Sequence, residues 1–208
     1  MFGLSHTSDV SISTDTEVNG IIFTPAATNA YTITVNLDIT LTLSGTGIMN
    51  NSGVTQNFMV GSGLSEGTQM RFTNSTSAGN ATIMAGDNGA QIDFFNRSTA
   101  ASATFFIGNS NSINFFNTST AGSSLIDNAN SIGARMNFAD NSTAGSATLN
   151  PRGHWLYKFS PGTLAQPQRR SSAAKAAGLI LAISPLQAAR RSLVLEVLAS
   201  SGRLGNRF

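Results

Sequence analysis

Apolar and polar residues alternate over short stretches in the first 150 residues of the chain. Residues 70–74 read Met-Arg-Phe-Thr-Asn, and residues 31–35 and 39–43 alternate in the same way. A period of two residues is typical of a β-strand with one buried face. Clusters of Gly, Asn and Ser, which favour turns, separate these stretches. The pattern therefore predicts many short strands joined by turns, with no helix in this region.

One block of this pattern occurs four times, at steps of 22, 21 and 23 residues. The copies are 70–83, 92–105, 113–126 and 136–149. Aligned positions keep one chemistry, so that an aromatic position holds Phe72, Phe94, Phe115 and Phe138, and a polar position holds Asn74, Asn96, Asn117 and Asp140. A unit this short cannot bury its apolar face alone, and stacking of successive units is the expected solution.

We therefore predict an all-β fold, a right-handed parallel β-helix with about 21–23 residues per coil, over residues 1–150. At that length per coil, residues 10–150 make about six or seven coils. Each aligned position then becomes a file, meaning a column of side chains at the same position in successive coils, spaced by about 4.8 Å. Phe72, Phe94, Phe115 and Phe138 are predicted to form a core stack.

The polar file of Asn74, Asn96, Asn117 and Asp140 has two interpretations. Side-chain amides aligned at the strand spacing can bond each other from coil to coil and form a structural ladder. Asp140 lacks an amide donor and is expected to interrupt such a ladder. In the other interpretation the file lies at an exposed turn, where Asn tolerates the left-handed backbone conformation.

Two further features of the repeat each have two interpretations. Adjacent hydroxyl residues precede each small-residue turn: Thr76/Ser77, Ser98/Thr99, Ser119/Thr120 and Ser142/Thr143. They either cap the turn, which we favour because Gly or Ala lies beside them, or form parallel hydroxyl files like those of ice-binding β-solenoids. The adjacent Phe pairs 94/95, 105/106 and 115/116 also allow two arrangements. Either one ring of each pair points outward and can bind a sugar or a protein, or the strand bends into a turn and both rings are buried.

Charge divides the chain at Pro151. The full 208 residues carry a net charge of +2, but residues 1–150 hold three Arg against nine acids and residues 151–208 hold nine basic residues against one acid. Ala/Leu-rich segments at 171–183 and 185–200 predict a helical or disordered tail. This basic tail either forms an amphipathic helix that contacts a membrane or nucleic acid, or is the product of a shifted reading frame in a GC-rich gene. We prefer the second interpretation. We therefore expect no nucleic-acid partner.

Composition excludes several kinds of chemistry. The chain has no Cys and only two His, which excludes thiolate nucleophiles and makes a multi-histidine metal site improbable. The acids Asp87, Asp93, Asp127 and Asp140 are expected to fall on different files, and Arg71, Arg97 and Arg135 share no file with one another. We therefore predict no catalytic, cofactor or metal site. No apolar stretch reaches the roughly 18 residues of a membrane-spanning helix.

Residues 18–34 (VNGIIFTPAATNAYTIT), residues 41–58 (LTLSGTGIMNNSGVTQNF) and the FFN-STAG-AT units resemble the passenger repeats of bacterial autotransporters and related surface proteins. The resemblance covers about residues 10–150. It implies a pectin-lyase-like β-helical stalk that is exported and often takes part in adhesion. No signal peptide and no C-terminal barrel pattern is visible, so an internal fragment or a truncated member is expected.

From the residues and this resemblance we expect a non-enzymatic structural or adhesive segment, extracellular or at the bacterial cell surface. Its partner would be a glycan or protein ligand, and the uncapped end of the last coil would favour self-association. Two alternatives remain open: a fragment of a carbohydrate-active β-helix enzyme, and an ice- or surface-binding solenoid. Assays for reducing ends and unsaturated products released from polysaccharides distinguish the enzyme from the non-enzymatic segment.

Overall fold

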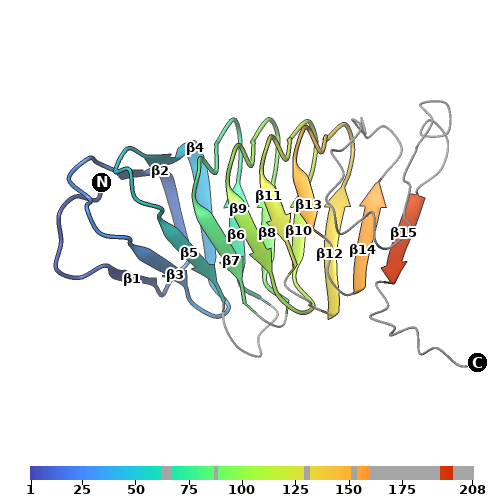
Figure 1. The fold of residues 1–208 in the computed structure, drawn as a ribbon, viewed down its shortest axis with the longest axis horizontal. Coiled ribbons are helices and arrows are strands. Elements are labelled where there is room, and N and C mark those ends of the chain that lie inside the picture. The colour runs from blue at the N-terminus through green and yellow to red at the C-terminus, as the bar shows by residue number, and fades with distance from the viewer. Residues whose placement is uncertain (62–66, 87–88, 129–131, 151–153, 160–192, 199–208) are drawn as a thin grey trace, which may run out of the picture.

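The structure is a computed structural model that describes residues 1–61, 67–86, 89–128, 132–150, 154–159 and 193–198 (Figure 1). Its described part is all-β and holds no helix, which confirms the predicted fold class. The strands are β1 (Asp9–Ile12), β2 (Thr16–Phe23), β3 (Thr32–Val35), β4 (Thr40–Asn50), β5 (Asn57–Val60), β6 (Gln69–Phe72), β7 (Thr82–Ala85), β8 (Gln91–Phe94), β9 (Thr104–Ile107), β10 (Ser112–Phe115), β11 (Leu125–Asp127), β12 (Ile132–Phe138), β13 (Thr148–Asn150), β14 (His154–Phe159) and β15 (Leu193–Leu198).

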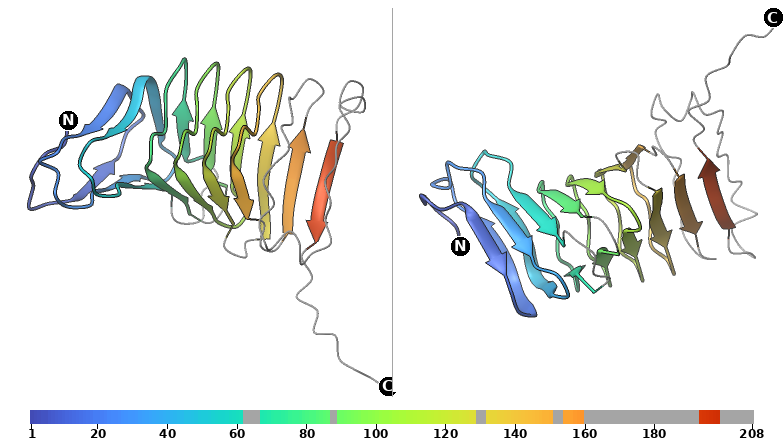
Figure 2. Two further views of the ribbon diagram at one scale, coloured as in Figure 1. Left: turned by 45° about the horizontal axis from the view of Figure 1, so that its top comes forward. Right: turned by 90° about the horizontal axis from the view of Figure 1, so that it is seen from below.

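The strands stack into a β-solenoid of about six turns with two sheets, in which all neighbouring strands except β14 and β15 pair in parallel. Sheet A has the order β15-β14-β12-β10-β8-β6-β4-β2, and sheet B has the order β1-β3-β5-β7-β9-β11-β13. From β1 to β14, odd-numbered strands lie in sheet B and even-numbered strands in sheet A, because each coil contributes one strand to each sheet. Strand β15 is the exception and lies at the end of sheet A. Figure 2 shows from two further directions that the coils follow one another along a single axis.

Each clear coil has the same course. A strand of sheet A directs alternate residues into the core, as Met70 and Phe72 of β6, and ends in a turn. A single residue then pairs with its equivalent in the next coil, as Ser77 does with Thr99 and Thr99 with Thr120, which forms a short third side. The strand of sheet B follows after a residue with positive φ, Gly79 at 63° in the first copy. A side chain at Gly79 would place its Cβ 2.6 Å from the Ile48 carbonyl oxygen, which explains the small residue there.

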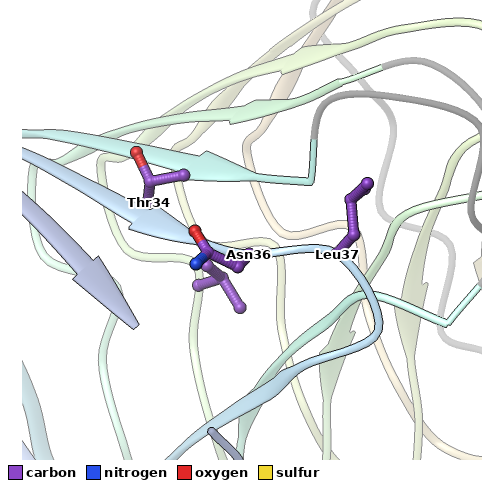
Figure 3. Close-up of a pocket in the computed structure, with 4 residues that line it drawn as sticks. Thr34, Asn36 and Leu37 are labelled. Atoms are coloured by element: carbon purple, nitrogen blue, oxygen red, sulfur yellow. The ribbon is translucent and has the colours of Figure 1, made fainter. Parts of the chain in front are cut away.

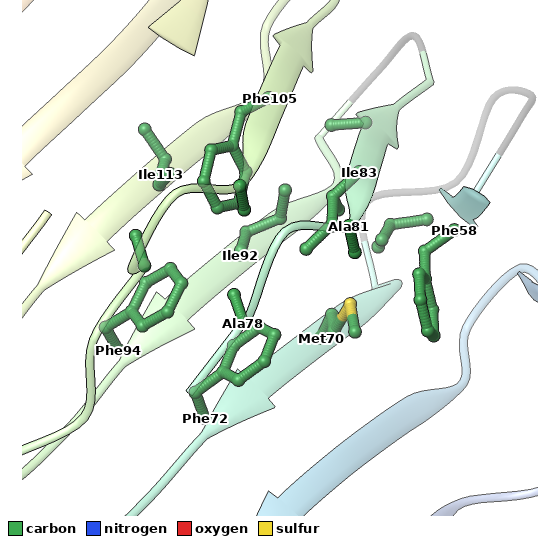
Figure 4. Packing of buried hydrophobic residues seen from close by; sticks show 14 of the residues in the cluster. Phe58, Met70, Phe72, Ala78, Ala81, Ile83, Ile92, Phe94, Phe105 and Ile113 are labelled. Atoms are coloured by element: carbon green, nitrogen blue, oxygen red, sulfur yellow. The ribbon is translucent and has the colours of Figure 1, made fainter. Parts of the chain in front are cut away.

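The core lies between the two sheets and consists of inward-facing side chains from both (Figure 4). Phe72 and Phe94 come from sheet A, and Phe58 and Phe105 come from sheet B; all four are fully buried. Burial of one such side chain contributes about 1.5–3 kcal/mol. The files at Met70 and Ile83, which the repeat also predicts as apolar, are in register between coils and buried.

Aromatic residues close the first coils. Phe2 pairs with Phe23, and their rings stack with centroids 5.2 Å apart. The Tyr31 ring lies edge-on to Phe2 at 5.0 Å, and its hydroxyl donates a hydrogen bond to the Gly3 carbonyl at 2.7 Å. This cluster shields the core at the N-terminal end of the solenoid.

Sheet A continues beyond Pro151. Strand β14 pairs in parallel with β12, with a register shift between Ile132 and Ala134, and β15 pairs antiparallel with β14. Trp155, Tyr157 and Phe159 alternate along β14 in a pattern that favours a strand. Residues 193–198, which lie within the predicted helix 185–200, are strand β15, so the helix prediction is wrong for them. Pairing with the edge of β14 overrides their helical spacing. The segment 171–183 lies outside the described residues.

Candidate functional site

The predicted core stack is present. Phe72, Phe94, Phe115 and Phe138 are fully buried, and their rings are nearly parallel with centroids 4.6, 4.9 and 4.8 Å apart. The interplanar angles of 4°, 10° and 7° show that the rings lie flat on one another along the axis. Phe94 also meets Phe105 of sheet B edge-on at 6.0 Å. The file therefore has a structural role: it fixes the coil spacing from inside.

The polar file of Asn74, Asn96, Asn117 and Asp140 combines both predicted interpretations. All four residues are exposed, with φ between 56° and 59°, in the left-handed region. Their side chains also link the coils, since the Asn74 N–H donates to Asn96 Oδ1 at 3.1 Å and the Asn96 N–H donates to Asn117 Oδ1 at 2.9 Å. These bonds join a side-chain oxygen to a backbone N–H, so the coils are not connected at this file by the predicted ladder of amide side chains.

Asp140 continues this ladder, and the prediction that it would interrupt it is wrong. Its Oδ2 accepts hydrogen bonds from the Asn117 backbone N–H at 2.7 Å and from Asn117 Nδ2 at 3.3 Å. Each residue of the file needs an acceptor oxygen toward the preceding coil, and a carboxylate supplies that oxygen as well as an amide does.

An amide ladder does occur, on the outer face of sheet A, where the sequence reading did not place it. Asn137 Nδ2 donates to Asn114 Oδ1 at 2.5 Å, and Asn114 Nδ2 donates to Asp93 Oδ1 at 2.6 Å. Arg71 is in register with Asp93 in the same file. The alignment of residues 70–72 with 92–94 could have identified this file, because Arg71, Asp93, Asn114 and Asn137 share one position of the repeat.

Asp93 is an unusual residue in this file because it is only 5% exposed. Its burial raises the pKa of the carboxyl group above the ordinary value, while the hydrogen bond from Asn114 and the charge of Arg71 oppose the shift. Asp93 thus has a basic residue, Arg71, as its neighbour in the file, which was not predicted from the sequence. Asp93 serves as the terminal acceptor of the amide ladder.

The remaining acids do not converge with Asp93. Asp140 lies in the turn ladder, and Asp15 Oδ1 accepts a hydrogen bond from the Thr40 N–H at 2.8 Å. Asp127 ends β11 in sheet B, and Asp87 lies outside the described residues. Among the described residues, no group of three or more His, Cys, Asp or Glu could hold a metal ion.

The paired hydroxyl residues cap the turns, as we favoured. The second residue of each pair accepts a hydrogen bond from the backbone N–H two residues on: Ser77 Oγ from Gly79 at 3.0 Å, Thr99 from Ala101 at 3.0 Å, Thr120 from Gly122 at 3.0 Å and Thr143 from Gly145 at 3.1 Å. The first residue of each pair, Thr76, Ser98, Ser119 or Ser142, is fully buried. These hydroxyls are therefore part of the turn and do not form two exposed files.

In the Phe pairs, one ring points inward and the other outward. Phe95 and Phe116 are half-buried just after β8 and β10, and their rings stack at 4.9 Å. Phe106 lies on the outer face of sheet B and is 39% exposed. The outward interpretation holds for these rings, and Phe106 is the one whose surface is most open to a ligand.

A hollow of about 330 Å³ lies at the end of β3 (Figure 3). Its described lining consists of Thr34, Val35, Asn36 and Leu37. Val35 belongs to the core, whereas Leu37 is 41% exposed. The hollow thus combines a hydroxyl and an amide with apolar surface and contains no charged side chain among these residues.

Comparison of the chain with models of protein families, with curated proteins and with solved structures gives no match. In the part of the chain that the structure describes, no helix is both long and apolar enough to cross a membrane.

Proposed function

We propose that the chain is a non-enzymatic structural and adhesive segment of an exported bacterial surface protein, with its solenoid outside the cell. The observation that carries the proposal is how the polar side chains are used. Asp93 accepts a hydrogen bond from the next coil, and Asp140 accepts two from the preceding one. These carboxylates hold the coils together along the axis.

A catalytic carboxyl group must meet a different requirement, which is access to the substrate. A general acid or base must lie within hydrogen-bond reach of a proton on the substrate. Asp93 is almost fully buried and its Oδ1 is held by Asn114 at 2.6 Å. Asp140 is exposed, but the described residues place no second carboxylate in its file. These environments suit a scaffold better than a polysaccharide-cleaving centre.

The dimensions of the repeat also suit a stalk. The seven strands of sheet B stack over about 29 Å at the usual strand spacing of about 4.8 Å. Each additional copy of the repeat lengthens the rod by one spacing and leaves its cross-section unchanged. The resemblance of residues 18–34 and 41–58 to autotransporter passenger repeats supports export and exposure at the cell surface.

Two assays on the purified chain test the proposal together. Beads coated with the chain should adhere to bacterial or host cells more than albumin-coated beads, and chain carrying Phe94→Ala, which we expect to unfold, should lose the effect. Incubation of the chain with acidic and neutral polysaccharides should release no reducing ends and no unsaturated products. Product that increases with protein concentration would contradict the proposal and favour an enzyme, and beads that adhere no better than albumin would remove its adhesive part.

A further inference from the structure

The outer face of sheet B carries no charged residue from β3 to β9. In each of these four-residue strands the first and third side chains point outward, as the alternating burial shows. The four strands are in register, so the outward residues form two adjacent files. The eight residues are Thr32, Thr34, Asn57, Met59, Thr82, Met84, Thr104 and Phe106.

One file is rich in hydroxyls that are free to bind. Within the described residues, the hydroxyls of Thr32, Thr82 and Thr104 make no hydrogen bond to the protein, and neither does that of Thr34 at the start of the second file. By contrast, the hydroxyls of Thr99 and Thr120 each accept a hydrogen bond that caps a turn. Hydroxyls on this face can therefore both donate to and accept from a ligand.

The second file becomes apolar along its length. Met59, Met84 and Phe106 are successive partners in register, and Phe106 is 39% exposed. The two files lie two residues apart along each strand, about 6.6 Å. The face is thus a flat platform with a row of hydroxyls beside a row of apolar side chains.

The platform has definite limits. Asp9 precedes Thr32 in the first file, and Asp127 follows Phe106 in the second. The hollow lined by Thr34 and Leu37 adjoins the platform at the end of β3.

We propose that this platform, together with the adjoining hollow, binds a neutral polysaccharide. The inference rests on the proposed adhesive function and names the class of its ligand. Sugar hydroxyls would hydrogen-bond to the Thr row, while the C–H faces of the rings would pack on Met84 and Phe106. Because the platform has no basic residue, an acidic polysaccharide would lose hydration of its carboxylates without gaining an ion pair. The partner is therefore an uncharged glycan.

Co-sedimentation with insoluble polysaccharides tests the inference. The probes are microcrystalline cellulose and chitin as neutral polymers and calcium alginate gel as an acidic one. The full chain should sediment with at least one neutral polymer, independently of salt, and not with alginate. The double substitution Thr82→Val/Thr104→Val removes two hydroxyls with little change in shape, and should weaken binding on the order of tenfold. Phe106→Ala should weaken binding to a similar extent.

The control is Thr148→Val, the same substitution in the same file but on β13, beyond Asp127. It should bind like the unmodified chain, and circular dichroism should show that all variants are folded. Failure to bind either neutral polymer, or binding that both platform variants retain, would overturn the inference. So would a dimer that Phe106→Ala dissociates, since the face would then belong to a second copy of the chain. Beads that still adhere to cells in any of these cases would leave the proposed function intact.

Discussion

Replacing Phe94 by Ala should destabilise the solenoid more than any outward substitution. The Phe94 ring is fully buried, lies between Phe72 at 4.6 Å and Phe115 at 4.9 Å, and meets Phe105 edge-on at 6.0 Å. Truncation of a buried Phe to Ala typically costs about 3–5 kcal/mol. Loss of two stacked partners at about 0.5–1.5 kcal/mol each places Phe94 in the upper half of that range. A whole domain is typically stable by only about 5–15 kcal/mol, so the variant should be partly or fully unfolded at 25 °C.

The matched control is Phe116→Ala, because Phe116 is also stacked on one ring, Phe95, at 4.9 Å but is only half-buried. It should cost about 1 kcal/mol, since less surface and one stack are lost. Urea unfolding followed by far-ultraviolet circular dichroism measures both variants against the unmodified chain. Equal losses for Phe94→Ala and Phe116→Ala, or a loss below about 1 kcal/mol for Phe94→Ala, would refute the reasoning that the inner stack carries the core.

Two further predictions concern the polar files, and a third concerns the glycine of the turn. Because burial raises the pKa of Asp93, the folded state binds a proton more readily than the unfolded state, so stability should fall as pH rises from the unfolded pKa through the raised one. The substitution Asp93→Asn keeps an acceptor for Asn114, and it should increase the melting temperature at neutral pH and remove this pH dependence. A pH profile of stability that is the same in the variant as in the unmodified chain would argue against this prediction. Asn96→Ala should lower the free energy of unfolding by about 1–2 kcal/mol, because it removes the acceptor for the Asn74 N–H and places at φ 58° a residue whose side chain cannot hydrogen-bond locally. Asn96→Gly tolerates that φ and should therefore cost less stability in the same urea experiment. Gly122→Val should prevent close stacking, since a Cβ there would lie 2.7 Å from the Ala101 carbonyl oxygen at φ 62°; a melting temperature equal to that of the unmodified chain would contradict this contact.

The fold could be predicted from the sequence because the same chemistry recurs at the same positions. Period-two alternation identified the strands, and the 21–23-residue step placed Phe72, Phe94, Phe115 and Phe138 in one stack, as the structure confirms. A repeated position predicts which side chains are neighbours. It does not predict which atoms bond, and therefore the turn ladder at Asn74 was expected to join amides when it joins a side chain to a backbone N–H.

Other features depend on tertiary context. The alignment of the repeats shows that Arg71 and Asp93 share one file. The burial of Asp93, however, follows from packing on the outer face of sheet A. Strand β15 has a helical spacing of apolar residues, and it is the free edge of β14 that favours the extended form. The uncharged platform on sheet B combines strands that are separated by more than 20 residues, so it becomes recognisable only when the register is known.

Distances between coils test the central claim, the stacking of successive repeats along one axis, most directly. The chain has no Cys, so spin labels can be attached at Thr32→Cys with Thr148→Cys and at Asp9→Cys with Thr148→Cys. These positions lie in one file of sheet B and are separated by five and six strand spacings, about 24 Å and 29 Å at about 4.8 Å each. Pulsed electron paramagnetic resonance should give two narrow distributions near these values, the second about 5 Å longer than the first. Broad distributions, or distances that do not increase with the number of coils between the labels, would contradict the stacked solenoid.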